Sequence, residues 1–130
     1  MLAQIREDFL RIQVIDDELQ KEKGRNEPDL KAVSKYVSEI TRRSQRLKEN
    51  LLLPKVEIGN PSSPAPETRE FLGARLGFLS KSIEAFVANP IFESAKIVNA
   101  NLSLQASHDL EQIILNSKEI KRSTDRLRHR

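Results

Sequence analysis

Hydrophobic residues recur along most of the chain at intervals of three and four, the period of one face of an α-helix. The first such stretch covers residues 2–23, and Gly24 can end it because glycine readily takes the left-handed conformation after a last turn. The next, over residues 27–51, alternates its spacing as in knobs-into-holes packing. Its apolar seam consists of Leu30, Val33, Val37, Ile40, Ser44, Leu47 and Leu51. Both stretches are predicted to be helices.

The second half of the chain repeats this organisation. A third periodic stretch begins near residues 66–68 and ends before Pro90, because the residue that precedes a proline disfavours helical dihedrals. A fourth begins between residues 94 and 102 and ends near Leu127. The two halves are joined by residues 52–67, whose four prolines exclude a regular element.

Amphipathic helices of this length are marginal alone in water and become stable by burying their apolar faces together. The sequence therefore predicts an all-α protein, an antiparallel up-and-down four-helix bundle with a long proline-rich crossover between the second and third helices. A chain of 130 residues is long enough for one core, so we expect a single domain over residues 1–130. It would comprise a helical hairpin at 1–51, the crossover at 52–67 and a second hairpin at 68–130.

Composition agrees with a helical protein. Charged residues make up 32% of the chain and aromatic residues only 5%, too few for a large sheet. The absence of cysteine excludes disulfides and thiolate metal sites, which suits the cytoplasm. No stretch approaches the roughly 20 apolar residues of a membrane helix. We therefore expect a cytoplasmic protein without a membrane partner.

The second and fourth helices align when the chain is shifted by 80 residues. Ile40 and Leu47 then fall on Ile120 and Leu127, and seven of ten compared pairs are identical. This internal repeat suggests a duplicated helical hairpin. The alternative is that two amphipathic helices of similar composition align by chance.

Positive charge is concentrated in two segments. Residues 30–50 carry a net charge of +4 and residues 116–130 carry another +4, whereas residues 1–29 carry −3. If the second and fourth helices run parallel, their basic C-terminal halves share one end of the bundle. We interpret this basic face as mainly solvated, since cations near helix C-termini are favoured by the helix dipole. Its members, candidates for contact with a partner or with phosphates, are Arg42, Arg43, Arg46, Arg122, Arg126 and Arg128.

Residue patterns for catalysis or for cofactor binding are missing. There is no phosphate-binding loop, no nucleophile elbow and no Glu-x-x-His pair for a metal, so no cofactor, metal or enzymatic activity is expected. Asp16 is the remaining question, because one choice of helical frame buries it in the core, opposite Ser117. The simpler interpretation lets Ile15 take the buried position and turns Asp16 outward. Ser44 and Thr124 are expected to fill core positions by bonding to the preceding turn.

These observations favour a small helical-bundle protein-interaction module without catalytic activity, with a protein partner or a second copy of the chain as its target. The surplus of apolar residues beyond one seam supports this, since those left outside the core would mark an interface. The surplus residues are Leu10, Val14, Tyr36, Phe71, Phe78, Ile114 and Leu115. The alternative is a nucleic-acid-binding protein that uses the basic end of the second and fourth helices, which is less favoured because stacking aromatics and recognition motifs are missing.

Overall fold

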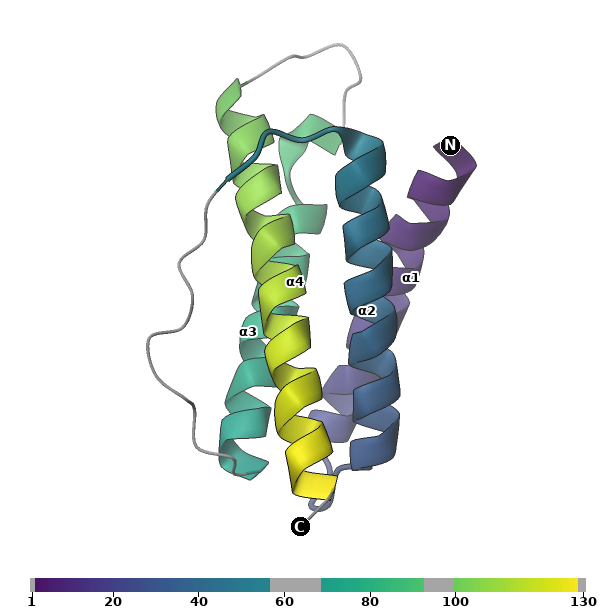
Figure 1. The fold of residues 1–130 in the computed structure, drawn as a ribbon, viewed down its shortest axis with the longest axis vertical. Coiled ribbons are helices and arrows are strands. Elements are labelled where there is room, and N and C mark those ends of the chain that lie inside the picture. Colours follow the sequence, from purple (N-terminus) through teal and green to yellow (C-terminus); the bar gives the residue numbers. More distant parts are fainter. Residues whose placement is uncertain (1, 57–68, 93–99, 129–130) are drawn as a thin grey trace.

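The computed structural model describes residues 2–56, 69–92 and 100–128, and 88% of the described residues are helical. The helices are α1 (Leu2–Lys23), α2 (Leu30–Leu51), α3 (Arg69–Val87), the short 3-10 helix η1 (Pro90–Phe92) and α4 (Ala100–Arg128). They form one bundle (Figure 1), so the predicted all-α four-helix class is confirmed. Residues 57–67 of the crossover and the expected start of the third helix at 66–68 lie outside the described residues.

The second helix begins later than predicted. Its N-cap is Asp29, whose carboxylate accepts a hydrogen bond of 3.2 Å from the amide of Ala32, so the first helical residue is Leu30 rather than residue 27. At its other end Leu52 takes a left-handed conformation with φ 52°, which closes the helix without a glycine.

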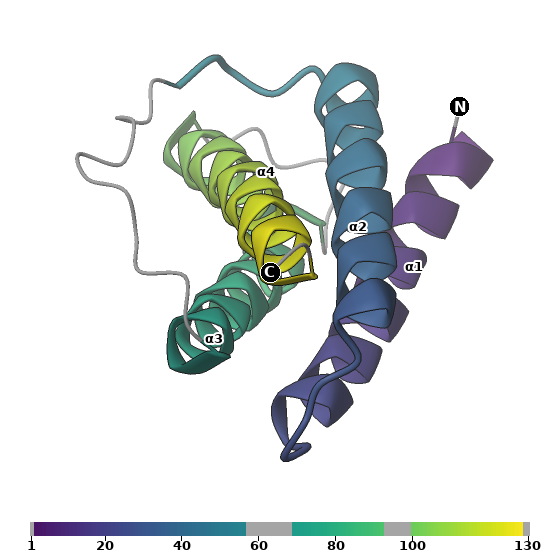
Figure 2. The same ribbon diagram turned by 60° about the horizontal axis from the view of Figure 1, so that its bottom comes forward.

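Each helix packs against two neighbours, in the order α1, α2, α4, α3 around the bundle. Neighbouring helices run antiparallel in both views (Figures 1 and 2). The prediction that the second and fourth helices run parallel is therefore wrong. Three side-chain pairs along α2 and α4 fix their opposite directions, Ser34 with Asp125, Thr41 with Ser117 and Lys48 with Glu111.

The direction of α3 explains this difference from strict up-and-down order. α3 begins at the end of the bundle where α2 begins, not where α2 ends (Figure 1), so α2 and α3 point the same way on opposite corners. The connection between them is long enough to return along the whole bundle, whereas a short turn would have forced alternation. α1 and α4 occupy the other diagonal and are also parallel to each other.

The core contains most of the predicted seam residues. Ile40, Leu47, Leu79 and Ile113 are fully buried, whereas Leu127 is only partly buried near the end of α4. At the other end of the bundle η1 adds an aromatic cluster that the periodicity did not indicate. Its rings belong to Phe9, Phe86 and Phe92, with centroids 5.0 to 5.9 Å apart.

The two core hydroxyls behave differently. Thr124 donates to the carbonyl of Ile120 one turn earlier, as predicted. Ser44 is equally buried, so its predicted core position is confirmed, but its Oγ has no hydrogen-bond partner within the described part of the chain, and the predicted bond to the preceding turn is wrong. Duplication of a helical hairpin stays a prediction, although both hairpins are antiparallel.

Candidate interaction surface

The arginines proposed as one basic face lie in two places. Arg42, Arg43 and Arg46 belong to the second half of α2, whereas Arg122, Arg126 and Arg128 belong to the last turns of α4. Because α2 and α4 are antiparallel, these two groups lie in opposite halves of the bundle, on either side of the contact between Thr41 and Ser117 (Figure 1). The shared basic end expected from the sequence does not form.

Two of the α2 arginines hold a buried carboxylate of α1. Asp8 is completely buried, and Arg46 approaches it with Nε at 2.7 Å from Oδ2 and Nη2 at 2.6 Å from Oδ1. Arg43 Nη1 donates to Oδ1 at 2.9 Å, and its Nε donates to Glu39, four residues earlier on α2, at 2.9 Å. Burial alone would raise the pKa of Asp8, but the hydrogen bonds and charges of Arg46 and Arg43 outweigh it and lower that pKa.

The placement of Arg46 corrects the sequence interpretation. We expected Arg46 on the solvent side of α2, yet 62% of its side chain is covered. Its long aliphatic chain lets the guanidinium group reach the carboxylate of Asp8 on α1. Arg42 is exposed, as expected. On α4, Arg122 pairs with Glu119 at 3.3 Å, and Arg128 lies 3.9 Å from Asp125. The α2 arginines therefore join helices, and the α4 arginines lie near the surface.

Asp16 is also buried, so the interpretation that turned it outward is wrong. α1 packs against both α2 and α3, and its buried face is wide enough for Ile15 and Asp16 together. Ser80 of α3 donates to Asp16 Oδ2 at 3.0 Å and Gln20 donates to Oδ1 at 3.3 Å. Burial raises the pKa of Asp16, these two hydrogen bonds partly offset the rise, and the negative charges of Asp17 and Glu84 add to it.

The outer face of α3 carries an exposed apolar stripe. Its residues follow one another at intervals of 3, 4, 3, 4 and 3, and all but the first, which is partly covered, are exposed. We call this set the α3 stripe: Phe71, Ala74, Phe78, Lys81, Ala85 and, directly after the last residue of α3, Ala88. Phe78 leaves 54% of its surface in water, an unusual exposure for an aromatic ring. The stripe is separate from the seam with which α3 faces the core.

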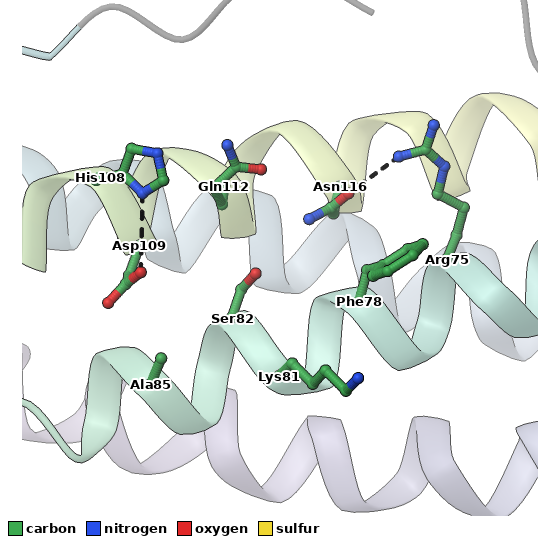
Figure 3. A pocket seen from close by; sticks show the side chains of 9 residues that line it. All are labelled: Arg75, Phe78, Lys81, Ser82, Ala85, His108, Asp109, Gln112 and Asn116. Atoms are coloured by element: carbon green, nitrogen blue, oxygen red, sulfur yellow. Dashed lines mark hydrogen bonds and ion pairs between the residues drawn. The ribbon is translucent and has the colours of Figure 1, made fainter. Parts of the chain in front are cut away.

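A groove of about 480 Å³ lies beside the α3 stripe, between α3 and α4 (Figure 3). Arg75 crosses it, donating from Nη1 to the side-chain oxygen of Asn116 at 3.3 Å, and its guanidinium carbon lies 4.9 Å from the centre of the Phe71 ring. Lys81 extends on the side of α3 away from α4, and His108 stands on the α4 rim (Figure 3). The groove and stripe therefore combine apolar surface with basic groups.

A second exposed stripe follows the outer face of α1. It has the spacing 4, 3, 4, 3 and 4, and we call it the α1 stripe: Ala3, Glu7, Leu10, Val14, Asp17 and Lys21. At its centre Leu10 is 61% exposed and Val14 is 40% exposed. The sequence had singled out Leu10, Val14 and Phe78, and all three are exposed, whereas Ile114 is buried in the core.

The small and charged members of both stripes were missed from the sequence. Alanine carries little hydrophobic signal, and the sequence analysis did not single out Glu7, Asp17 or Lys81. The sequence signal that could have revealed both stripes is a second set of positions with the 3-and-4 spacing on the same helix. This set lies at least one third of a turn around the helix from the core seam.

Known families, curated proteins and solved structures were compared with this chain, and none matches. None of the described helices is long and apolar enough to cross a membrane. Within residues 2–56, 69–92 and 100–128, no group of three or more potential ligands could hold a metal ion.

Proposed function

We propose that the protein is a non-enzymatic, cytoplasmic helical-bundle interaction module that binds a protein helix on the outer face of α3. The observation that carries the proposal is the α3 stripe, which repeats on a solvent-facing surface the spacing that core helices use to pack. α3 therefore has two faces with helix-packing spacing, one buried in the core of the bundle and one exposed to solvent. The exposed face supports binding of a further helix.

The residues of the stripe suit a helical ligand. Phe78 supplies one large side chain that a partner can cover, and burying such a ring contributes about 1.5 to 3 kcal/mol. Ala74 and Ala85 flank it within two turns and allow another helix to approach at about 8 to 10 Å. Lys81 and Arg75 add positive charge at the margins, which favours a ligand with acidic flanks.

The nucleic-acid alternative has less support. It required a basic end shared by α2 and α4, and the two basic segments lie in opposite halves of the bundle. Arg43 and Arg46 are also engaged with Asp8, so binding a phosphate there would compete with a buried carboxylate. A phosphate-binding surface would have to be built from Arg42 and the exposed α4 arginines separately.

Site-specific photo-crosslinking in the native cells tests the proposed module. A photoreactive residue in place of Ala74, at the centre of the stripe, should give a discrete protein adduct, and Phe78→Asp should abolish it. The matched control places the same group at Lys35, an exposed position of α2 outside both stripes, and should give none. Adducts of equal yield from both positions, or none from Ala74, would refute binding on this face.

A further inference from the structure

The α1 stripe and the α3 stripe are complementary in charge. The apolar pair of the α1 stripe, Leu10 and Val14, is flanked on both sides by an acid, Glu7 and Asp17. The centre of the α3 stripe has Lys81 on one side and, on the other, Phe71, over whose ring the guanidinium of Arg75 lies 4.9 Å from the centre. We propose that the helix bound on the α3 stripe is α1 of a second copy of this chain. This inference rests on the proposed function and names its partner.

The two stripes also match in spacing. On α1 the order acid, apolar, apolar, acid occupies residues 7, 10, 14 and 17, at intervals of 3, 4 and 3. On α3 the positions 71, 74, 78 and 81 have the same intervals. Both sets therefore cover ten residue-to-residue steps, about 15 Å at 1.5 Å per step. Each member of one stripe has a counterpart at the same height on the other.

Antiparallel docking, which opposes the two helix dipoles, fixes these counterparts. Leu10 lies on Phe78 and Val14 lies on the small Ala74. Glu7 then faces Lys81. Asp17 faces position 71, where the guanidinium of Arg75 rests over the aromatic ring at 4.9 Å from its centre. Both acids of the α1 stripe thus meet a base.

Pairing of like stripes is less favourable. Two α1 stripes that place Leu10 against Val14 also place Glu7 against Asp17, so like charges meet at both ends of the contact. Two α3 stripes would bring the basic groups of both copies together, with His108 of each groove close by. Charge therefore selects the mixed contact between α1 and α3.

The mixed contact joins two different surfaces of the chain. Such a heterologous contact leaves one unused stripe on each end of a pair, so further copies can add until a ring closes or a chain extends. The wild-type protein should therefore show a sedimentation coefficient and mean mass that rise with concentration. Added salt should lower the association, because part of the contact is ionic.

Two complementary variants test the contact. Leu10→Lys with Val14→Lys blocks the α1 stripe and leaves the α3 stripe intact, whereas Phe78→Glu does the reverse. All three positions are at least 40% exposed, so both variants should keep the helical circular dichroism of the wild type. Each variant alone should sediment as a monomer of 14.9 kDa. An equimolar mixture should form a pair and stop there, because its remaining stripes are both blocked.

Several outcomes would overturn the inference. A wild-type chain that stays monomeric at about 1 mM, or a mixture of the variants that stays monomeric while the wild type associates, would each exclude this contact. Lys35→Glu, a charge change outside both stripes, should leave self-association unchanged. Loss of self-association in this variant would indicate a nonspecific charge effect. If the wild type is monomeric but Ala74 crosslinks to a different protein, the interaction module stands and only the second copy is excluded.

Discussion

Two buried carboxylates on α1, eight residues apart, differ in how their negative charge is compensated. Asp8 is fully buried and faces α2, where Arg43 and Arg46 hold it with three hydrogen bonds of 2.6 to 2.9 Å. Asp16 is 6% exposed and faces α3, and its partners are neutral groups, the hydroxyl of Ser80 on α3 and the side-chain amide of Gln20 on α1 itself. The pKa of Asp8 is lowered and the pKa of Asp16 is raised. The same residue type on one helix therefore has opposite effects on stability.

The difference lies in what the facing helix offers. α2 supplies permanent positive charges that compensate the buried carboxylate of Asp8, which also fixes how α1 and α2 align. α3 supplies only a hydroxyl, so the charged form of Asp16 is incompletely compensated. At neutral pH the contact of α1 with α2 is thus electrostatically favourable, and the contact of α1 with α3 carries a penalty.

The largest effect is expected from Asp8→Asn. The substitution removes the carboxylate that Arg43 and Arg46 share, and leaves Arg43, whose side chain is only 12% exposed, with Glu39 as its remaining charged partner. We expect a loss of about 2 to 3 kcal/mol in the free energy of unfolding at pH 7, below the roughly 3 to 5 kcal/mol of a fully buried pair because Arg46 is partly in water. Urea denaturation followed by circular dichroism measures it.

The pH dependence of this site has a defined sign. Because folding lowers the pKa of Asp8, its contribution is complete above the ordinary value of an aspartate and is lost as the pH falls through the folded-state pKa. The variant should therefore lose less stability than the wild type on acidification. A loss below about 0.5 kcal/mol at pH 7 would show that the pair with the arginines contributes nothing net.

The contrast between the two sites was only partly accessible from the sequence. The seams identified the core through residues such as Ile40 and Leu79, because apolar spacing reports directly which face a helix buries. The helical spacing could not predict the contacts of Arg46, since its long side chain starts on the outer side of α2 and still reaches Asp8 on α1. Asp16 was misplaced because the width of the buried face depends on how many helices α1 contacts.

Helix direction was the other limit. The relative direction of α2 and α4 depends on where the crossover delivers the chain, and a proline-rich connection of this length permits either end of the bundle. The sequence therefore predicted two basic segments correctly but placed them together. For the interaction surface it marked the exposed Phe78 and Leu10, but the neighbouring alanines and charges gain meaning only when both outer faces are known.

A smaller effect is expected from Ser80→Ala. The hydroxyl of Ser80 donates to Asp16 at 3.0 Å inside the bundle, and a hydrogen bond to a charged group contributes about 1.5 kcal/mol or somewhat more. Its loss should destabilise the protein by about that amount at pH 7 and raise the pKa of Asp16 further, since one of the groups that favour the carboxylate is gone. Carbon-13 detected NMR titration of the Asp16 carboxyl measures the pKa. An unchanged pKa would mean that the hydroxyl does not reach the carboxylate in solution.

The smallest effect, with the opposite sign to that at Asp8, is expected from Asp16→Asn. The amide keeps both neighbours, because its oxygen accepts from Gln20 and its nitrogen donates to the Ser80 hydroxyl, but it removes the buried negative charge. Folding raises the pKa of Asp16, so the acid's contribution to stability is complete below its ordinary pKa and is lost as the pH rises through the folded-state value. The variant should therefore be more stable than the wild type by about 1 kcal/mol at pH 7, and this gain should vanish on acidification to about pH 3.

Asp17→Asn, which changes the exposed carboxylate next to Asp16, is the matched control and should show a much smaller gain. A destabilised Asp16→Asn variant at pH 7 would mean that the carboxylate is compensated as well as Asp8 is, and the contrast between the two faces of α1 would not hold.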